Sequence, residues 1–144
     1  MPGREKIVEI LAKVPLFQHF DQRQLKRLAE HFADRPFEAG KEIVTQGKEG
    51  IGLFIIVSGR TEAVRERMDG TKSIVNEFGP GDFFGEMALL DDGPRTASVV
   101  ATEPTECLVL LRWDFFAALR EEPDTAIMVL QALARRFRQE LDTL

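Results

Sequence analysis

The spacing of apolar residues divides the chain into two helical ends and a stranded middle. Over 4–32 and again over 113–143, apolar side chains recur three and four residues apart, which is the period of an α-helix packed on one face. Asp21 is a favourable N-cap within the first region, and Pro123 lies where a helix start favours proline in the second. The pattern therefore predicts helices at both ends of the chain.

Between these ends, residues 36–112 show short apolar stretches separated by glycines. Short strands at such spacing are typical of an antiparallel β-barrel or sandwich, and Asp69-Gly70 is a strong hairpin signal. The sequence predicts an α+β, mainly β fold: an antiparallel β-barrel or jelly roll of about eight strands, flanked by N- and C-terminal helices, in a single domain of 1–144. The clearest expected strands are 53–58, 61–67, 72–78, 95–101 and 106–112.

Composition narrows the class of protein. The 144 residues are 44% hydrophobic and 30% charged, which is too apolar for a disordered chain. No apolar run approaches the roughly 20 residues that cross a bilayer, so no membrane insertion is expected. The formal net charge of −5 comes without a basic stripe, which argues against direct nucleic acid binding. The single cysteine, Cys107, favours a reducing, cytoplasmic location and a buried apolar role.

The most informative stretch is 79–98. Its glycines leave backbone amides accessible just before a short helix-like piece, 86–90, and free amides at such a turn favour an anion. Nine residues after Glu86 comes Arg95, whose planar fork is suited to the same anion. A carboxylate beside a phosphate is tolerated when it accepts from a hydroxyl of the same ligand. The local chemistry therefore predicts a small molecule that carries both a phosphate and a sugar hydroxyl.

The same residues carry a resemblance to a known family. Phe-Gly-Glu-Met-Ala-Leu-Leu over 84–90, followed by Pro-Arg-Thr-Ala-Ser over 94–98, resembles the phosphate-binding cassette of the cyclic nucleotide-binding domain family. That family includes kinase regulatory subunits, cyclic-nucleotide-gated channels and the bacterial catabolite activator. The segments 37–47 and 53–59 are similar to the family's first strands and turn glycines, so the resemblance extends over 10–140.

The resemblance implies a ligand, cAMP or cGMP, without any further cofactor. It implies that Glu86 accepts the ribose 2′-hydroxyl and that Arg95 pairs with the cyclic phosphate. The other implied ligand contacts are the amides of Gly85, Met87 and Ala88 at the phosphate, Thr96 beside it, and Ala63, Asn76 and Phe78 on the barrel wall near the base. Thr96 is compatible with either base, so the preference stays open, with cAMP favoured.

Simpler interpretations compete with these roles. Glu86 and Arg95 are also compatible with a structural ion pair beside a turn, and a strand asparagine such as Asn76 is often only solvated. An enzyme on a jelly-roll barrel would need clustered histidine and carboxylate ligands, but 36–112 contains no histidine. We therefore expect no catalytic residue and no metal site.

The function expected from these features is a non-catalytic cyclic nucleotide sensor in signal transduction. One alternative is the ligand-binding fragment of a larger regulator, a transcription factor or a channel. A direct DNA reader of the catabolite-activator kind would need a helix-turn-helix beyond the last helix, about sixty residues that 1–144 does not contain. Another alternative is a degenerate cassette that acts as a protein-interaction module. The sequence does not name the effector protein.

The last helix is the expected output element. Its apolar stripe is long, so its distal half needs a second surface: a symmetric partner helix, giving a homodimer, or the bound base in a monomer. Like charges at Arg135-Arg136 disfavour a tight helix pair, so the sequence favours a mobile lid in which Arg135, Arg136 or Phe137 covers the base. The stripe consists of Ala126, Leu130, Leu133, Phe137, Leu141 and Leu144.

Overall fold

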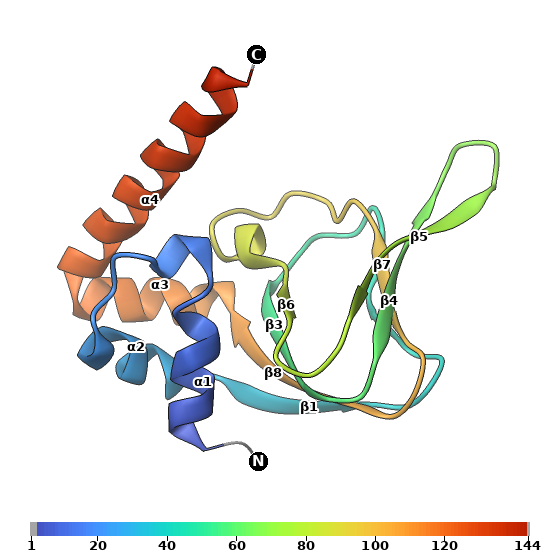
Figure 1. Ribbon diagram of the computed structural model, residues 1–144, viewed down its shortest axis with the longest axis horizontal. Coiled ribbons are helices and arrows are strands. Elements are labelled where there is room, and N and C mark those ends of the chain that lie inside the picture. Colours follow the sequence, from blue (N-terminus) through green and yellow to red (C-terminus); the bar gives the residue numbers. More distant parts are fainter. Residues whose placement is uncertain (1–2, 144) are drawn as a thin grey trace. The chain divides into compact units, whose positions relative to one another are not determined.

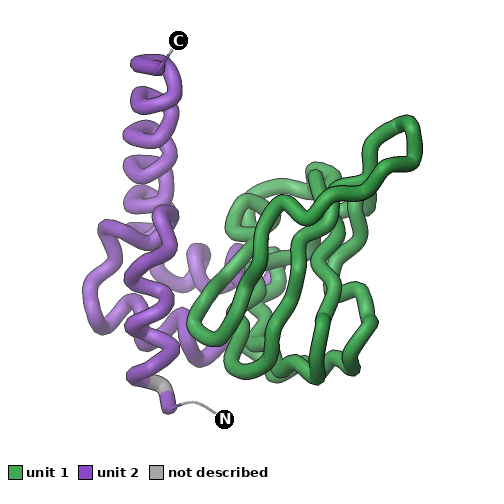
Figure 2. Tube along the Cα trace, turned by 45° about the vertical axis from the view of Figure 1, so that its right-hand side comes forward, with its two compact units in different colours: residues 1, 32–112 green, residues 2–31, 113–144 purple. Residues whose placement is uncertain are grey.

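The computed structural model describes residues 3–143, and their contacts separate two compact units (Figure 2). The first unit is the stranded region, 32–112. The second combines the N-terminal segment up to residue 31 with the C-terminal segment from residue 113. Each unit has buried apolar side chains of its own, so the two segments at the ends of the sequence share one helical unit.

The first unit consists of two antiparallel four-stranded sheets (Figure 1). Their strand orders are β1-β8-β3-β6 and β2-β7-β4-β5. This is the jelly-roll class that the sequence predicts, built as two sheets without a closed barrel. The strands are β1 (Ala33–Phe37), β2 (Glu42–Val44), β3 (Gly52–Ser58), β4 (Thr61–Glu66), β5 (Lys72–Phe78), β6 (Phe83–Phe84), β7 (Ser98–Ala101) and β8 (Thr105–Leu111).

Strand alternation and register decide which side chains of the second sheet point inward. On β4, Thr61 pairs with Phe78 and Ala63 pairs with Asn76, so both pairs lie on one face of the sheet. Ala63 also pairs with Val99 of β7, and both are buried. A β-bulge between Ala63 and Val64 shifts the register of the rest of β5 by one residue.

The first expected strand begins earlier than predicted. Proline usually interrupts a strand, so the sequence suggests that the stranded region starts at 36, but β1 runs from Ala33 through Pro36. The reason is its position in the sheet. β1 pairs only with β8 and forms an edge, where a residue without an N–H group is tolerated.

The expected strand 95–101 is shorter in the structure, because β7 begins at Ser98. The backbone of Arg95 bonds instead to the β2–β3 loop: its N–H donates to the Lys48 carbonyl at 2.9 Å, and its carbonyl accepts from the Gly47 N–H at 2.8 Å. Arg95 therefore belongs to a connection held by a neighbouring loop, and not to the regular sheet.

The second unit is helical, and its N-terminal helices form as expected. Asp21 caps α2 through a complete capping box with Gln24, whose side chain accepts from the Asp21 N–H at 2.8 Å. Leu11, Phe17 and Phe115 are fully buried in this unit. The helices are α1 (Arg4–Leu11), η1 (Pro15–Phe17), α2 (Gln22–Ala29), α3 (Arg112–Glu121), which starts at the last residue of the first unit, and α4 (Pro123–Asp142).

The buried face of α4 differs from the apolar stripe that the sequence suggests. Thr125, Val129 and Ala132 are buried. Leu130 is 64% exposed, although the stripe includes it. Small side chains form the buried face because they allow close helix packing. The spacing of hydrophobic residues alone does not reveal this preference for small side chains.

The distal half of α4 is exposed from residue 134 to 143, including Phe137 and Leu141. A regular helix turns about 100° per residue, so Phe137 points about 20° from Leu130, whereas Arg135 and Arg136 point about 140° and 120° away. The two arginines therefore lie outside the exposed apolar face. In a helix pair formed through this apolar face, the arginines of the two copies would not face each other, so repulsion between them does not argue against such a pair. Leu144, the last member of the stripe, lies outside the described residues.

Candidate functional site

The centre of the cassette is a left-handed turn at Gly85. Gly85 has φ of +85° and forms the N-cap of η2 (Glu86–Leu89), the short helix expected over 86–90. A Cβ atom added there would lie 2.7 Å from both Arg95 Nη2 and the Gly52 carbonyl oxygen. Both the backbone conformation and the close approach require glycine. The guanidinium of Arg95 therefore rests directly against the backbone of this turn.

Arg95 is held on several sides but keeps an unused donor. Its Nη2 donates to the Gly52 carbonyl at 3.0 Å, and its Cζ lies 6.0 Å from the centre of the Phe54 ring. Gly50 allows a further close approach, since a Cβ there would lie 3.0 Å from Arg95 Nε. That Nε is buried and has no hydrogen-bond acceptor among the described residues. A buried N–H group in this state favours an acceptor supplied by a ligand.

Burial also affects the pKa of the Arg95 guanidinium. Burial lowers the pKa of the Arg95 guanidinium below its ordinary value. An arginine nevertheless remains protonated in proteins, so the site carries a positive charge with reduced access to water. A desolvated cation of this kind attracts an anion more strongly than an exposed one. No carboxylate forms an ion pair with Arg95 within residues 3–143, so the structural ion-pair interpretation with Glu86 is not supported.

Two adjoining cavities meet at Arg95. The first, of about 370 Å³, is lined by the cassette, and the second, of about 330 Å³, by the barrel wall. Both are lined by Gly85, Arg95 and Thr96. All nine candidate ligand contacts line one cavity or the other: Gly85, Glu86, Met87, Ala88, Arg95 and Thr96 the first, and Ala63, Asn76 and Phe78 the second. The structure brings the predicted residues together around a connected polar and apolar space.

Within the cassette the predicted contacts differ in their availability. Glu86 is half-buried, and its Oε2 atom is fully buried. Met87 is 45% exposed. The N–H of Ala88 donates to the Gly85 carbonyl at 3.1 Å, as the three-residue turn of η2 requires. The Ala88 amide therefore already has an acceptor, which the sequence does not reveal.

The second cavity has an aromatic wall. The ring of Phe84 stacks on Phe54 at 5.1 Å between centroids and lies 5.2 Å from the ring of Phe78. Ala63 is buried beside these rings in the same core cluster. Asn76 is exposed, and its Oδ1 accepts from the N–H of Glu77 at 2.9 Å. Rings and small apolar side chains suit the flat face of a heterocyclic base.

Two further residues of the site escape sequence reasoning. Arg112 lies 24 positions after Ala88, yet its Nε donates to the Ala88 carbonyl at 3.0 Å and its Nη2 donates to the Gly50 carbonyl. No local pattern predicts such a contact. Arg65 lines the second cavity, and strict alternation from Ala63 along β4 was the available signal for it.

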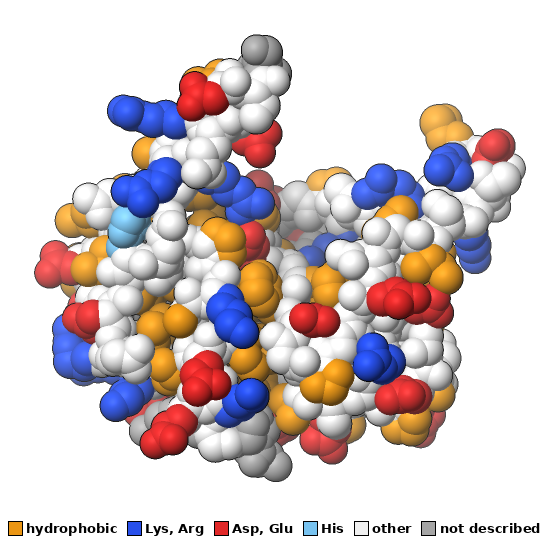
Figure 3. Space-filling model, in the orientation of Figure 1, with side chains coloured by type: hydrophobic (Ala, Val, Ile, Leu, Met, Phe, Trp, Pro, Cys, Tyr) orange, Lys and Arg blue, Asp and Glu red, His pale blue; other side chains and the backbone are white. Residues whose placement is uncertain are grey.

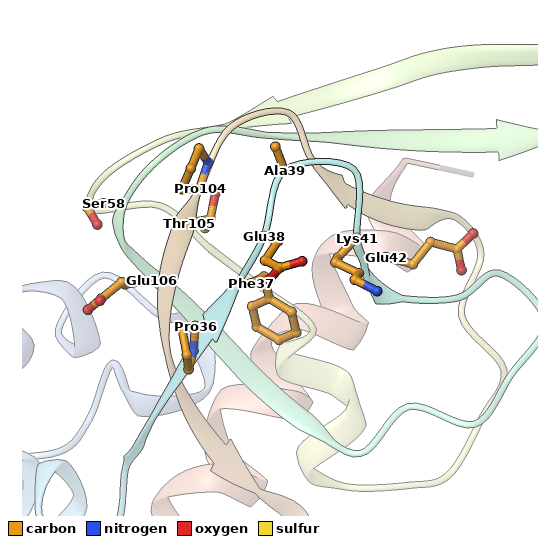
Figure 4. A pocket seen from close by; sticks show the side chains of 10 residues that line it. All are labelled: Pro36, Phe37, Glu38, Ala39, Lys41, Glu42, Ser58, Pro104, Thr105 and Glu106. Atoms are coloured by element: carbon orange, nitrogen blue, oxygen red, sulfur yellow. The ribbon is translucent and has the colours of Figure 1, made fainter.

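A larger open cavity of about 980 Å³ lies elsewhere on the first unit (Figure 4). Three of its lining side chains are carboxylates, Glu38, Glu42 and Glu106, against one cation, Lys41. Such a lining repels a phosphate. Size alone therefore does not indicate the anion site, which the half-buried arginine, Arg95, marks instead.

The remaining sequence-predicted features lie outside these cavities. Cys107 is fully buried, as expected, and burial raises the pKa of its thiol to about 12. The proposed lid residues Arg135, Arg136 and Phe137 belong to the second unit and are exposed. Within 3–143, no three side chains of His, Cys, Asp or Glu gather as metal ligands do, and no helix has the length and apolarity needed to cross a membrane.

A family model for the cyclic nucleotide-binding domain matches residues 34–122. The chain belongs to the cyclic nucleotide-binding domain family. The matched residues include the cassette, both cavities and all of α3, so the family assignment and the site geometry concern the same part of the molecule.

Individual relatives agree with this assignment. The chain is 39% identical over 133 residues to the cyclic AMP receptor protein of Thermus thermophilus, covering 90% of this chain and 62% of that protein. It is 37% identical over 115 residues to the cAMP-dependent protein kinase regulatory subunit of Dictyostelium discoideum, covering 78% of this chain and 35% of that protein. The chain spans less than two thirds of the length of either protein.

A solved structure matches the chain over nearly its whole length. The N-terminal domain of a transcriptional regulator from Streptomyces coelicolor superposes with a TM-score of 0.86 at 30% identity. The match covers 94% of each chain. The jelly-roll fold with flanking helices is thereby confirmed.

Proposed function

We propose that this chain is a non-catalytic sensor module that binds cAMP through the cassette and the barrel wall. The observation that carries the proposal is the half-buried guanidinium of Arg95, whose Nε lacks an acceptor within the described residues at the junction of two cavities. A cyclic phosphate supplies the missing acceptor, and the ribose 2′-hydroxyl donates to Glu86. The names of the Thermus and Dictyostelium relatives, both of which refer to cAMP, support this ligand.

The proposed absence of catalysis follows from the chemistry at the site. Two carboxylates line the cassette cavity, Glu86 and the exposed Asp91, and the proposed role of Glu86 is to accept from a sugar hydroxyl. Hydrolysis of a cyclic phosphate needs an activated water or a nucleophile with its base, and we assign neither role to the candidate ligand contacts. We also propose a cytoplasmic location, because cyclic nucleotide signalling and a buried free thiol both suit a reducing compartment.

The decisive test is a calorimetric titration of the purified chain with cAMP, cGMP and a cyclic dinucleotide, side by side. We expect saturable binding of one mononucleotide per chain and no comparable binding of the dinucleotide, because the cassette offers one guanidinium, that of Arg95, for one phosphate. Absence of binding by both mononucleotides would contradict the proposal and favour a degenerate cassette that acts as a protein-interaction module.

A second proposal concerns the protein to which this module belongs. The chain matches about three fifths of the Thermus cyclic AMP receptor protein, and the Streptomyces structure is the N-terminal domain of a transcriptional regulator. We infer that the module serves within, or alongside, a larger regulator, a transcription factor or a channel. Ligand-dependent capture of a defined effector, with and without cAMP, tests whether the module acts through a partner.

The proposed output is a change in α4. Its exposed apolar side chains, Leu130, Phe137 and Leu141, either cover the bound base as a lid, with Arg135 or Arg136 beside it, or pair with α4 of a second copy. The lid makes the protein a ligand-responsive monomer, and the pair makes it a homodimer. Light scattering with and without cAMP separates these outcomes.

A further inference from the structure

Arg65 is a cationic side chain at the base wall to which no role has yet been assigned. It pairs with Ser73 of β5 and lies two residues beyond Ala63 on β4, on the same face of the sheet. Its Nε donates to the Thr96 carbonyl at 3.3 Å, which brings the guanidinium to the residues that both cavities share. Arg65 is exposed, and the residues from 3 to 143 give it no ion-pair partner within 4.0 Å.

The other polar groups of this wall are also hydrogen-bond donors. The Oδ1 atom of Asn76 already accepts from the N–H of Glu77, and its amide NH₂ group can donate to a ligand. Arg95 offers only N–H groups, and the Thr96 hydroxyl can donate or accept. The side chains around the second cavity therefore present mainly donors, among rings and aliphatic groups.

Figure 3 shows Lys and Arg side chains over the hairpin formed by β4 and β5, to which Arg65, Arg67 and Lys72 belong. The same hairpin also carries acidic side chains, so its cations are interspersed with carboxylates: Glu62, Glu66, Asp69 and Glu77. Arg67 continues the strand toward the hairpin turn but does not line the cavity. Charge at the hairpin and charge at the cavity can therefore be separated by mutation.

From these contacts we infer that Arg65 reads the acceptor atoms of the purine edge and so determines base preference at this site. The inference rests on the proposed function, because it requires a bound cyclic nucleotide. Adenine offers one acceptor, N7, next to its N6 amino donor, whereas guanine and hypoxanthine offer N7 and O6 side by side. A guanidinium fork matches the second pattern with two hydrogen bonds and the first with one. The donor wall accordingly accepts 6-oxopurine cyclic nucleotides at least as well as cAMP.

The experiment measures dissociation constants of cAMP and of cyclic inosine monophosphate for the unaltered chain, Arg65→Ala and Arg67→Ala. Cyclic inosine monophosphate differs from cAMP in its oxygen at position 6 and the proton at N1, and it lacks the additional amino group of guanine. We expect Arg65→Ala to weaken binding of the inosine nucleotide roughly 5- to 150-fold more than binding of cAMP. This range corresponds to the free energy of a bidentate contact between an arginine and a base. Arg67→Ala removes the same charge from the hairpin and should change both constants alike, by less than about threefold.

A third pair of ligands identifies the atom that is read. The 7-deaza analogues of both nucleotides lack the N7 acceptor, so they should bind the unaltered chain more weakly than the parent ligands, and Arg65→Ala should erase this difference. Equal weakening of both parent nucleotides by Arg65→Ala would overturn the inference and leave Arg65 as a support for the Thr96 carbonyl. The inference would also be overturned if Arg65→Ala left the dissociation constants of both parent nucleotides unchanged. If the unaltered chain binds neither parent nucleotide, the proposed function itself fails.

Discussion

The cassette and the distal half of α4 represent opposite ways of placing functional side chains. In the cassette, Arg95 is held by backbone bonds to the β2–β3 loop, by the Gly52 carbonyl and by the Phe54 ring, all within one compact unit. In α4, every residue from 134 to 143 is exposed. These contacts hold the proposed ligand-binding groups in place without a ligand, whereas α4 leaves apolar side chains exposed.

This difference separates recognition from response. Preorganised groups bind without the entropic cost of being ordered, so the cassette is suited to recognition. An exposed helix end with few buried contacts belongs to the low-stability part of a protein, and such parts respond readily to ligands. Mutations in the cassette should therefore change affinity strongly, and mutations in distal α4 should change the stability of the isolated chain little.

The largest effect is expected for Arg95→Ala. Removing the guanidinium deprives a buried phosphate of its charge partner, which costs about 2–5 kcal/mol of binding free energy. Calorimetric titration with cAMP measures the loss, and Arg67→Ala, an exposed arginine of the same unit, serves as the control. Binding of Arg95→Ala within twofold of the unaltered chain would refute the phosphate assignment.

Glu86→Ala should weaken cAMP binding less, by about 1.5–3 kcal/mol, because one charge-assisted hydrogen bond to a ribose hydroxyl is lost. The comparison with 2′-deoxy-cAMP sharpens this expectation. The deoxy ligand should bind the unaltered chain more weakly than cAMP, and Glu86→Ala should bind the two ligands equally. A persistent preference for cAMP in the variant would assign the hydroxyl to another residue.

Gly85→Ala tests the close approach between the turn and the arginine. The new methyl group meets the Arg95 guanidinium and the Gly52 carbonyl, and alanine is strained at φ of +85°. We expect a loss of about 1–3 kcal/mol in the free energy of unfolding, together with weaker cAMP binding. Thermal and denaturant unfolding provide the measurement. Gly81→Ala is a useful control, since its φ is +88° but a Cβ there meets nothing within 4 Å.

Glu122→Gln addresses the start of α4, where two arginines of α2 contact the Glu122 carboxylate. The Glu122 carboxylate lies 2.5 Å from Arg23 and 3.3 Å from Arg27, and the hydrogen bond from Arg23 is the main cause that lowers the pKa of Glu122 below its usual 4.5. The stabilisation is therefore fully present above pH 4.5 and is lost as the pH falls through the lowered folded value. Glu122→Gln should lower the melting temperature at pH 7 and reduce its decline below pH 4.5. Equal acid sensitivity of both proteins would contradict this role.

The smallest effect on stability is expected for Phe137→Ala. The side chain is 65% exposed, so its removal should change the free energy of unfolding of the isolated chain by less than about 0.5 kcal/mol. The matching measurement of function is hydrogen exchange over 124–143 with and without cAMP, alongside light scattering. Protection that appears with ligand in a monomer supports the lid. Unchanged protection in a ligand-independent dimer would establish α4 as a fixed helix pair.

Much of the fold follows from local patterns in the sequence. Asp21 caps α2 because its side chain accepts from the Gln24 N–H and the Gln24 side chain accepts from the Asp21 N–H. Both hydrogen bonds join residues that are neighbours in the chain. The expected strand 72–78 coincides with β5, since alternation and the Asp69-Gly70 turn are local too. The cassette residues were recognisable for a similar reason: glycines, Glu86 and Arg95 lie within one short segment.

What the sequence alone determined is the set of local elements, the position of the cassette and its chemistry, because these depend on residues close together in the chain. Tertiary structure alone decided that Pro36 lies within an edge strand, that the β2–β3 loop holds the Arg95 backbone, and that Arg112 reaches the Ala88 carbonyl. These contacts join residues 24 to about 70 positions apart, and their pairing depends on sheet order and register, which no local pattern encodes.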